Sequence, residues 1–167
     1  AGASMINDVS ALQAEGALAT CAASDVAVCL MHKQGTPADM QNDPYYENVI
    51  AEVSAFLDQR AAACRGAGIA ADRIVIDPGF GFGKTVAHNF ALLRDLKALT
   101  SLGYPVLAGL SRKSSLGAVT SRPVEDRLAA SLAAALLAAQ NGATILRVHD
   151  VRETVDVLKI WQAMRKN

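Results

Sequence analysis

The chain has 167 residues, of which 51% are hydrophobic and 19% are charged. This is the composition of one soluble globular domain with a substantial core, and it excludes a disordered or fibrous chain. The 16 basic and 16 acidic residues cancel, so no net field would draw nucleic acid or an anionic membrane surface. We therefore expect no nucleic-acid and no membrane partner.

The three cysteines, Cys21, Cys29 and Cys64, are odd in number and lack metal-type or Cys-x-x-Cys spacing. Free thiols in a reducing cytoplasm fit this pattern better than a disulfide framework. The alanine-rich stretch 129–139 is shorter than a membrane span, and no charged start followed by an apolar run and a cleavage site is present. We expect a cytoplasmic, unprocessed protein.

Short β-prone runs alternate with longer helix-like segments along the whole chain. Strands are expected at residues 5–6, 26–31, 74–76, 105–110 and 143–148. Helices are expected at residues 15–23, 46–65, 86–102, 123–140 and 151–165. Glycines that could form left-handed caps follow three of these helices, at positions 66 and 68, 103, and 142. The pattern predicts five β/α units in one parallel α/β domain.

Two architectures are compatible with this alternation, an open sheet and a closed barrel. The length favours an open five-stranded sheet, because an eight-fold barrel usually needs roughly 250 residues. The start of the chain favours the barrel, because Met5 enters a strand with no preceding helix. At about 30 residues per unit, three further units before Ala1 would approach the length of a full barrel.

Polar residues follow the expected strands at the point where each strand ends. They are Asn7 and Asp8, His32, Asp77, residues 111–113 and residues 147–150. In parallel α/β folds of either type that edge carries the active site. The alternative is that strand ends are polar only because they reach the surface.

The segment 76–84 places a carboxylate, Asp77, before a loop with alternating glycines. Glycines allow close backbone approach, and two exposed phenylalanines, Phe80 and Phe82, would be costly unless they cover something. A ligand-contacting loop is therefore predicted, with a glycine-rich turn plugged by aromatic rings as the alternative. A P-loop is excluded because Pro78 stands where its first glycine must be, and the alternating glycines also exclude a dinucleotide fingerprint.

Two further segments carry cations. Residues 109–114 combine Arg112 and Lys113 with two serines, either as a ligand site or as a solvated basic turn. In residues 144–150, strand alternation sends Arg147 and His149 to one face. Burial of that pair would require an anion, which could be an unseen carboxylate or a phosphate-like ligand. His32 and His88 have no ligand-type spacing, so no metal ligand is assigned.

The segments INDVSAL, VCLMHKQGTP, DPGFGFGK, GLSRKS and RVHDV occur in the order and spacing of dihydropteroate synthases. The resemblance covers essentially the whole chain and implies a partial (β/α)8 TIM barrel. Its five β/α units would correspond to strands 4–8, with the first three units missing. Residues 1–167 would then form the C-terminal part of a single pterin-binding barrel domain, which replaces the open sheet that length alone favours.

The resemblance also implies roles for individual residues. Pterin-binding residues would be Asn7, Met31, Asp77, Phe82, Gly109 and Lys113. Residues for p-aminobenzoate would be Phe80, Ser111 and Arg112. The diphosphate would bind Arg147 and His149, which together with Lys113 would be catalytic. Mg²⁺ is implied as the cofactor, with its protein ligand in the missing N-terminal part and no metal ligand in this chain.

The implied reaction joins a pterin diphosphate to p-aminobenzoate, in a folate-pathway transferase family that sulfonamides target. The signatures of the family's first three strands are absent, so we expect the chain alone to be inactive and prone to aggregation through its unpaired strand edges. The full-length form is expected to be a homodimer. The alternatives are a methyltetrahydrofolate-binding methyltransferase of the same superfamily and a non-catalytic barrel remnant.

Overall fold

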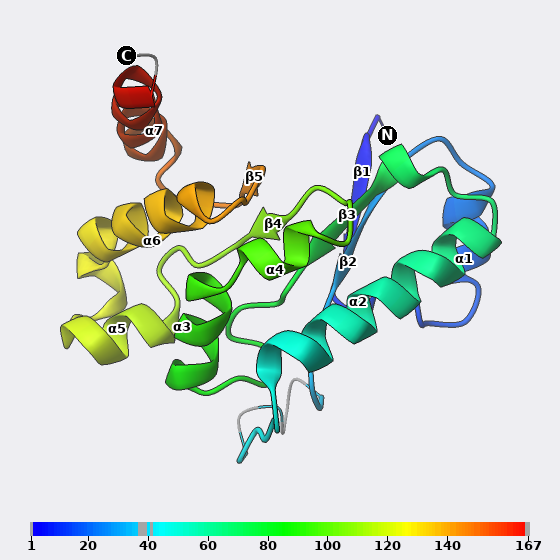
Figure 1. Cartoon of the computed structure of the whole chain (residues 1–167), viewed down its shortest axis with the longest axis horizontal. Coiled ribbons are helices and arrows are strands. Elements are labelled where there is room, and N and C mark those ends of the chain that lie inside the picture. Colours follow the sequence, from blue (N-terminus) through cyan, green and yellow to red (C-terminus); the bar gives the residue numbers. More distant parts are fainter. Residues whose placement is uncertain (1, 37–39, 41, 166–167) are drawn as a thin grey trace.

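The computed structural model describes residues 2–36, 40 and 42–165, so the last residue of the segment VCLMHKQGTP lies outside the described part. Five strands alternate with helices (Figure 1). The strands are β1 (Met5–Asp8), β2 (Ala27–Met31), β3 (Ile74–Asp77), β4 (Leu107–Ala108) and β5 (Ile145–Leu146). The α-helices are α1 (Ala17–Ala22), α2 (Val49–Gly66), α3 (Val86–Arg94), α4 (Lys97–Thr100), α5 (Ser114–Thr120), α6 (Leu128–Gln140) and α7 (Val151–Arg165).

All paired strands are parallel, and their order follows the chain. One sheet has the order β1-β2-β3, and a second sheet pairs β4 with β5. A single bridge between Ile76 and Val106 links the two sheets. The parallel α/β fold expected from the alternation of strands and helices is therefore confirmed.

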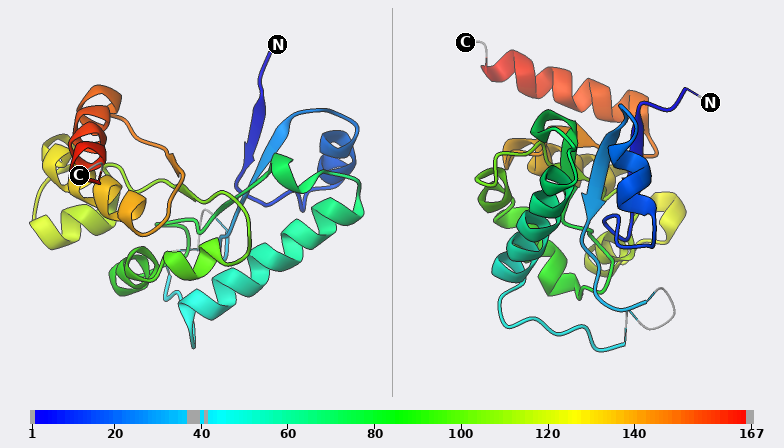
Figure 2. Two further views of the ribbon diagram at one scale, coloured as in Figure 1. Left: turned by 45° about the horizontal axis from the view of Figure 1, so that its top comes forward. Right: turned by 90° about the vertical axis from the view of Figure 1, so that its right-hand side faces the viewer.

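The two faces of the strands have different environments. The face that carries Val28, Ile76 and Val106 belongs to the large core, together with α2 residues such as Leu57. Figure 2 shows α2 running along one side of the strands. The opposite face holds a small cluster, in which Cys29, Val75 and Leu107 pack with Met5 and Ile145. Since side chains alternate along a strand, each strand contributes to both faces.

The long helix α2 follows directly from its sequence. The Asn48 side chain accepts hydrogen bonds from the backbone N–H groups of Ile50 and Ala51, which caps the first turn. Its buried residues recur at helical spacing, namely Val49, Val53, Leu57, Ala61 and Cys64. This apolar stripe anchors the helix on the sheet.

Several element boundaries differ from those expected. The helix expected over 86–102 is divided into α3, which has Asp95 as its C-cap, and α4. The helix expected over 123–140 starts with a 3-10 turn at Val124–Asp126 before α6 begins. The short helix α5 lies in a region for which no helix was expected. Strands β4 and β5 are two residues long. Pro105, which lies shortly before β4, has no N–H to donate to a neighbouring strand.

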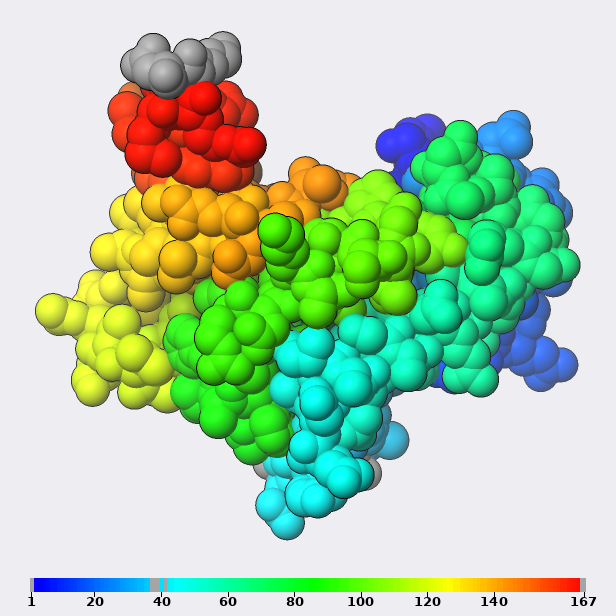
Figure 3. Space-filling model, viewed as in Figure 1, coloured from blue at the N-terminus to red at the C-terminus, as the bar shows by residue number. Residues whose placement is uncertain are grey.

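The cysteines are free thiols, as expected, and Cys21, Cys29 and Cys64 are all buried. Among the described residues, no helix has the length and apolar character needed to cross a membrane. Helix α7 stands out from the remainder of the molecule (Figure 3), and several of its apolar side chains, including Ile160 and Met164, are exposed.

Candidate active site

The ends of the strands bring predicted site residues to one edge on the face that the helices leave open. Asn7, Met31 and Asp77 lie two residues beyond Met5, Cys29 and Val75, which belong to the small cluster on that face. Gly109 and Arg147 stand in the same relation to Leu107 and Ile145. Strand alternation therefore places all five positions on one face. Met31 and Asp77 are also register partners in the β2–β3 pair.

The two cation-bearing segments meet in one cavity of about 340 Å³. It is lined by Gly109, Ser111, Arg112, Lys113, Val124, Arg147 and His149. Every lining residue except Val124 is a predicted site residue. Val124 begins a 3-10 turn ten residues after the segment 109–114, and no sequence signal pointed to it.

Two contacts tie the segment after β4 to the segment after β5. The Ser111 hydroxyl accepts a hydrogen bond from the His149 backbone N–H at 3.2 Å and lies 3.0 Å from His149 Nδ1. The Arg112 guanidinium holds Asp150 with both Nη2 and Nε, at 2.5 and 3.1 Å. This two-point hydrogen-bonded pair lowers the pKa of Asp150 and raises that of Arg112.

The Arg147 and His149 side chains are exposed, so they do not form a buried pair that would need an anion within the protein. The only carboxylate on this segment, Asp150, pairs with Arg112 instead. Within residues 2–36, 40 and 42–165, the Arg147 guanidinium has no hydrogen-bond acceptor from a side chain or backbone. It is a cation available to an anionic ligand.

Asp77 and Lys113 form the buried charged part of the site. Asp77 is 3% exposed, and its Oδ1 accepts a hydrogen bond from the Gly79 N–H at 2.7 Å. Burial raises the Asp77 pKa, opposed by that N–H and by the charges of Lys113, Arg147 and Lys84. Burial lowers the Lys113 pKa to about 8, opposed by Asp77. The Lys113 ammonium donates to the Phe80 carbonyl and lies 4.8 Å from the centre of the Phe82 ring.

Phe80 matches the alternative interpretation of this loop, a glycine-rich turn that is plugged by an aromatic ring. Its side chain is 1% exposed and packs in the large core, whereas Phe82 is half-buried. Gly79 and Gly81, with φ of 68° and 78°, turn the loop so that the Phe80 ring points inward. Only the Phe80 carbonyl borders the site, so the predicted contact of Phe80 with p-aminobenzoate has no exposed ring to make it.

Lys84 and Asn89 were missed by sequence reasoning and hold the same loop. Lys84 is 3% exposed, and its ammonium contacts His32 and two loop carbonyls. Asn89 is also 3% exposed, and its Oδ1 accepts a hydrogen bond from the Gly81 N–H at 2.7 Å. The sequence signal for Lys84 is its place directly after the glycines, which resembles the lysine of a P-loop without the spacing of one.

The described residues contain no group of three or more His, Cys, Asp and Glu side chains that could hold a metal ion. His32 is buried against Lys84, and His88 caps α3 in a reciprocal box with Thr85. These residues do not fit a metal site of their own, so no chemical step of this chain is assigned to Mg²⁺.

The fold and the site define a parallel α/β protein that combines a buried carboxylate with several cations at the carboxyl ends of its strands. The chain belongs to the family described as pterin binding enzyme, whose profile matches residues 1–149.

Within that family the chain is similar to dihydropteroate synthases, as its sequence motifs indicated. It is 54% identical to the dihydropteroate synthase of Haemophilus influenzae, over 97% of this chain and 59% of that protein. The crystal structure of the Stenotrophomonas maltophilia enzyme with active site-bound imidazole gives a TM-score of 0.96 at 56% identity, covering 98% of this chain and 62% of that one. The structure of the Xanthomonas albilineans enzyme in complex with 7,8-dihydropteroate gives a TM-score of 0.91 at 55% identity, covering 98% of this chain and 62% of that one. The chain thus spans 59% to 62% of the length of these relatives.

Proposed function

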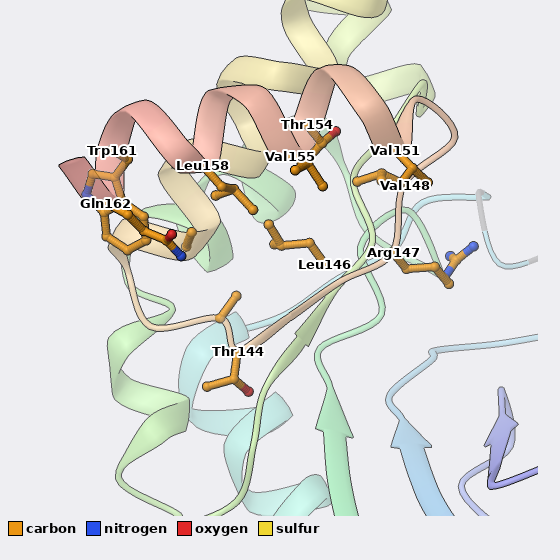
Figure 4. Close-up of a pocket in the computed structure, with 12 residues that line it drawn as sticks. Thr144, Leu146, Arg147, Val148, Val151, Thr154, Val155, Leu158, Trp161 and Gln162 are labelled. Carbon is orange, nitrogen blue, oxygen red and sulfur yellow. The ribbon is translucent and has the colours of Figure 1, made fainter. Parts of the chain in front are cut away.

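We propose that this chain provides the last five β/α units of a dihydropteroate synthase barrel, and that residues 1–167 are the C-terminal part of one pterin-binding domain. The parallel strand order and the helices gathered on one face support this proposal. A cavity of about 510 Å³ between β5 and α7 gives further support, because a neighbouring unit could fill it. Its apolar lining includes Leu146, Val155, Leu158 and Trp161. In Figure 4 Leu146 lies on the side of α7, whereas Arg147 is directed away from that helix.

We propose that the complete protein condenses 6-hydroxymethyl-7,8-dihydropterin diphosphate with p-aminobenzoate. The neutral amine nitrogen would attack the methylene carbon of the pterin, and the carbon–oxygen bond to the diphosphate would break. The electron pair leaves with the diphosphate, and the amine loses a proton to solvent. The products are 7,8-dihydropteroate and diphosphate. The family relationship and the 7,8-dihydropteroate complex of the Xanthomonas albilineans relative support this choice.

The observation that carries the proposal is the meeting of a buried carboxylate with unpaired positive charge at one edge. Arg147 has a guanidinium without a hydrogen-bond acceptor among the described residues, and it shares a cavity with His149 and Lys113. Cations placed there would stabilise the negative charge that develops on the departing diphosphate. No nucleophilic side chain is needed for such a displacement.

The other end of the site would read the pterin. The Asp77 carboxylate can accept from two neighbouring N–H groups, as an aminopyrimidine ring presents them, and Lys113 supplies a donor beside it. Met31 and Phe82 would contact the ring faces, Gly109 would leave room for the ring, and Asn7 would add a polar contact. Their common edge supports these roles.

For p-aminobenzoate, Ser111 and Arg112 remain our proposed contacts. Arg112 is already paired with Asp150, so it would bind the aminobenzoate carboxylate as a shared partner. Mg²⁺ is proposed for the complete enzyme on the family resemblance alone, with its protein ligand outside this chain. The same resemblance supports a cytoplasmic homodimer, and the exposed apolar side chains of α7 offer it a surface.

The test joins residues 1–167 to the part of the Haemophilus influenzae relative that they do not cover. We expect the joined protein to form dihydropteroate and the 167-residue chain alone to form none. Arg147→Ala should reduce the binding of pterin diphosphate but not of the pterin without its diphosphate. Arg65→Ala, an exposed arginine at the end of α2, is the matched control.

Three outcomes would contradict the proposal. Robust turnover by the chain alone would show that the five units suffice. Tighter binding of methyltetrahydrofolate than of pterin diphosphate by the joined protein would favour a methyltransferase, because that activity needs no diphosphate site. A folded joined protein without either affinity would favour the non-catalytic remnant.

A further inference from the structure

Lys84 is a buried lysine without a carboxylate among its hydrogen-bond partners in the described part of the chain. It is 3% exposed, and its Nζ lies 3.0 Å from His32 Nδ1, 3.1 Å from the Gly79 carbonyl and 3.0 Å from the Phe82 carbonyl. An ammonium group has three N–H donors, and three acceptors surround this one. The arrangement uses every donor of the charged lysine.

His32 provides a rigid acceptor for this lysine. Its side chain is 7% exposed and stands edge-on to Phe56, with ring centres 5.0 Å apart. Its backbone N–H donates to the Asp77 carbonyl at 3.0 Å, which fixes the end of β2 against the end of β3. In its charged form Lys84 can only donate, so His32 Nδ1 accepts, and burial together with the Lys84 charge lowers the pKa of His32 to about 3, which keeps the ring neutral with its proton on Nε2.

Tyr46 closes the other side of the same loop. Its hydroxyl donates to the Gly83 carbonyl at 2.8 Å, and the Lys84 ammonium lies 5.9 Å from the centre of its ring. The loop is also tight against its neighbours, since a side chain on Gly79 would overlap the His32 carbonyl oxygen. The loop position is therefore fixed from several sides, with Lys84 in the middle.

An apolar side chain would fill this place at lower cost than a lysine. Burial disfavours the charged form of this lysine and lowers the pKa of Lys84 to about 7, although the charge of Asp77 opposes this shift. Filling space alone does not explain a lysine here, because its burial is unfavourable. What lysine adds is a three-point connection between His32 and both ends of the turn 79–82.

That turn controls two groups of the proposed pterin site. The Gly79 N–H orients the Asp77 carboxylate. The Phe80 carbonyl receives Lys113, and Phe82 presents its ring below the same ammonium. A displacement of Gly79 or Phe82 would therefore move the Asp77 carboxylate, the Lys113 ammonium and the Phe82 ring together.

We propose that Lys84 is a positioning residue for the pterin site, which it serves by holding the turn 79–82 against His32. Lys84 does not touch the pterin. It sets the orientation of Asp77 and the place of Phe82, and His32 is its fixed acceptor. This inference rests on the proposed function.

The test uses the joined protein described above and measures pterin diphosphate affinity together with the KM for p-aminobenzoate. Lys84→Met keeps the length of the side chain and removes the donors. We expect it to weaken pterin binding by about tenfold or more, which corresponds to the loss of one well-made contact, while the KM for p-aminobenzoate changes little. Lys97→Met, which replaces an exposed lysine of α4, is the matched control.

Two His32 variants test the same contact from its other end. His32→Leu removes the acceptor and should reproduce the loss seen in Lys84→Met. His32→Asn places an amide oxygen near the position of Nδ1 and should recover most of the affinity. In the double variant Lys84→Met with His32→Leu, the two losses should not add, since both remove one interaction.

The outcomes separate this inference from the function on which it rests. If the unmodified joined protein binds no pterin diphosphate, the proposed function fails and the inference fails with it. If it binds and Lys84→Met binds equally well, or if pterin and p-aminobenzoate suffer alike, only the inference is overturned. Should Lys84→Met not fold, equal pterin affinity of His32→Leu and His32→Asn overturns it.

Discussion

Replacing His32 by asparagine is expected to flatten the acid dependence of the chain's stability. Burial, and to a lesser degree the charge of Lys84, lowers the His32 pKa from 6.5 to about 3. Between these two pH values the unfolded chain binds a proton at His32 that the folded chain does not bind. Unfolding is therefore favoured as the pH falls through this window.

The size of the effect follows from the difference between the two pKa values. Each pKa unit corresponds to about 1.4 kcal/mol, so the free energy of unfolding should fall by up to roughly 5 kcal/mol between pH 6.5 and pH 3. The contribution is fully present above pH 6.5 and is lost progressively below it. For a single domain this is a large part of the total stability.

Urea unfolding followed by far-UV circular dichroism, from pH 4 to pH 7.5, measures this dependence. His32→Asn should lose stability with acid less steeply than the unmodified chain, by close to one proton. His32→Leu should have the same shallow slope but a lower plateau, because it also removes the acceptor of Lys84. Parallel curves for all three proteins would refute the reasoning.

Two further substitutions and one labelling experiment have defined outcomes. Leu57→Ala, in the centre of α2, should lower the free energy of unfolding by about 2–5 kcal/mol in urea titrations, because it leaves a cavity in the large core; a cost below about 1 kcal/mol would contradict the packing described. Gly79→Ala should prevent stable folding or cost more than about 2 kcal/mol, since φ is positive and the new methyl group meets the His32 carbonyl. Cys29, whose pKa burial raises to about 12, should resist iodoacetamide at pH 8 until urea unfolds the chain, and rapid labelling detected by peptide mass mapping in the native state would show that the thiol is accessible.

Sequence patterns predicted much of the site because strand alternation and parallel pairing are strict. Parallel pairing puts the carboxyl ends of the strands at one edge, so Asp77 and Arg147 were expected near each other, and the period of two sent Arg147 and His149 to one face. These inferences need no knowledge of individual contacts.

Partnerships between charged groups could not be predicted in the same way. Alternation assigns a face, but it does not tell which cation a carboxylate contacts, and Asp150 pairs with Arg112 rather than with Arg147. The inward turn of Phe80 depends on the positive φ of two glycines, which composition allows but does not require. The role of Lys84 depends on three acceptors from separate segments, and only the folded chain brings them together.

Boundaries were less predictable than faces. The hydrophobic spacing continues from Leu92 and Leu93 through Leu96 to Leu99, so a single helix over 86–102 was the natural expectation. The helix is interrupted at Asp95, yet all four leucines remain buried. Burial thus persists from α3 into α4, and periodicity alone does not reveal where one helix ends and the next begins.

The single bridge between Ile76 and Val106 has a mechanical consequence for the proposed site. Asp77 ends a strand of one sheet and Arg147 follows a strand of the other, so within the described part of the chain no continuous ladder of backbone hydrogen bonds fixes the spacing between them. The contact of Lys113 with the Phe80 carbonyl spans this junction. A substrate whose ring binds Asp77 and whose phosphates bind Arg147 would connect the two sheets. Part of its binding free energy would offset the loss of motion between the sheets at the bridge of Ile76 and Val106. Pterin diphosphate should therefore protect the amides around Val106 from hydrogen exchange more than the pterin or diphosphate does alone.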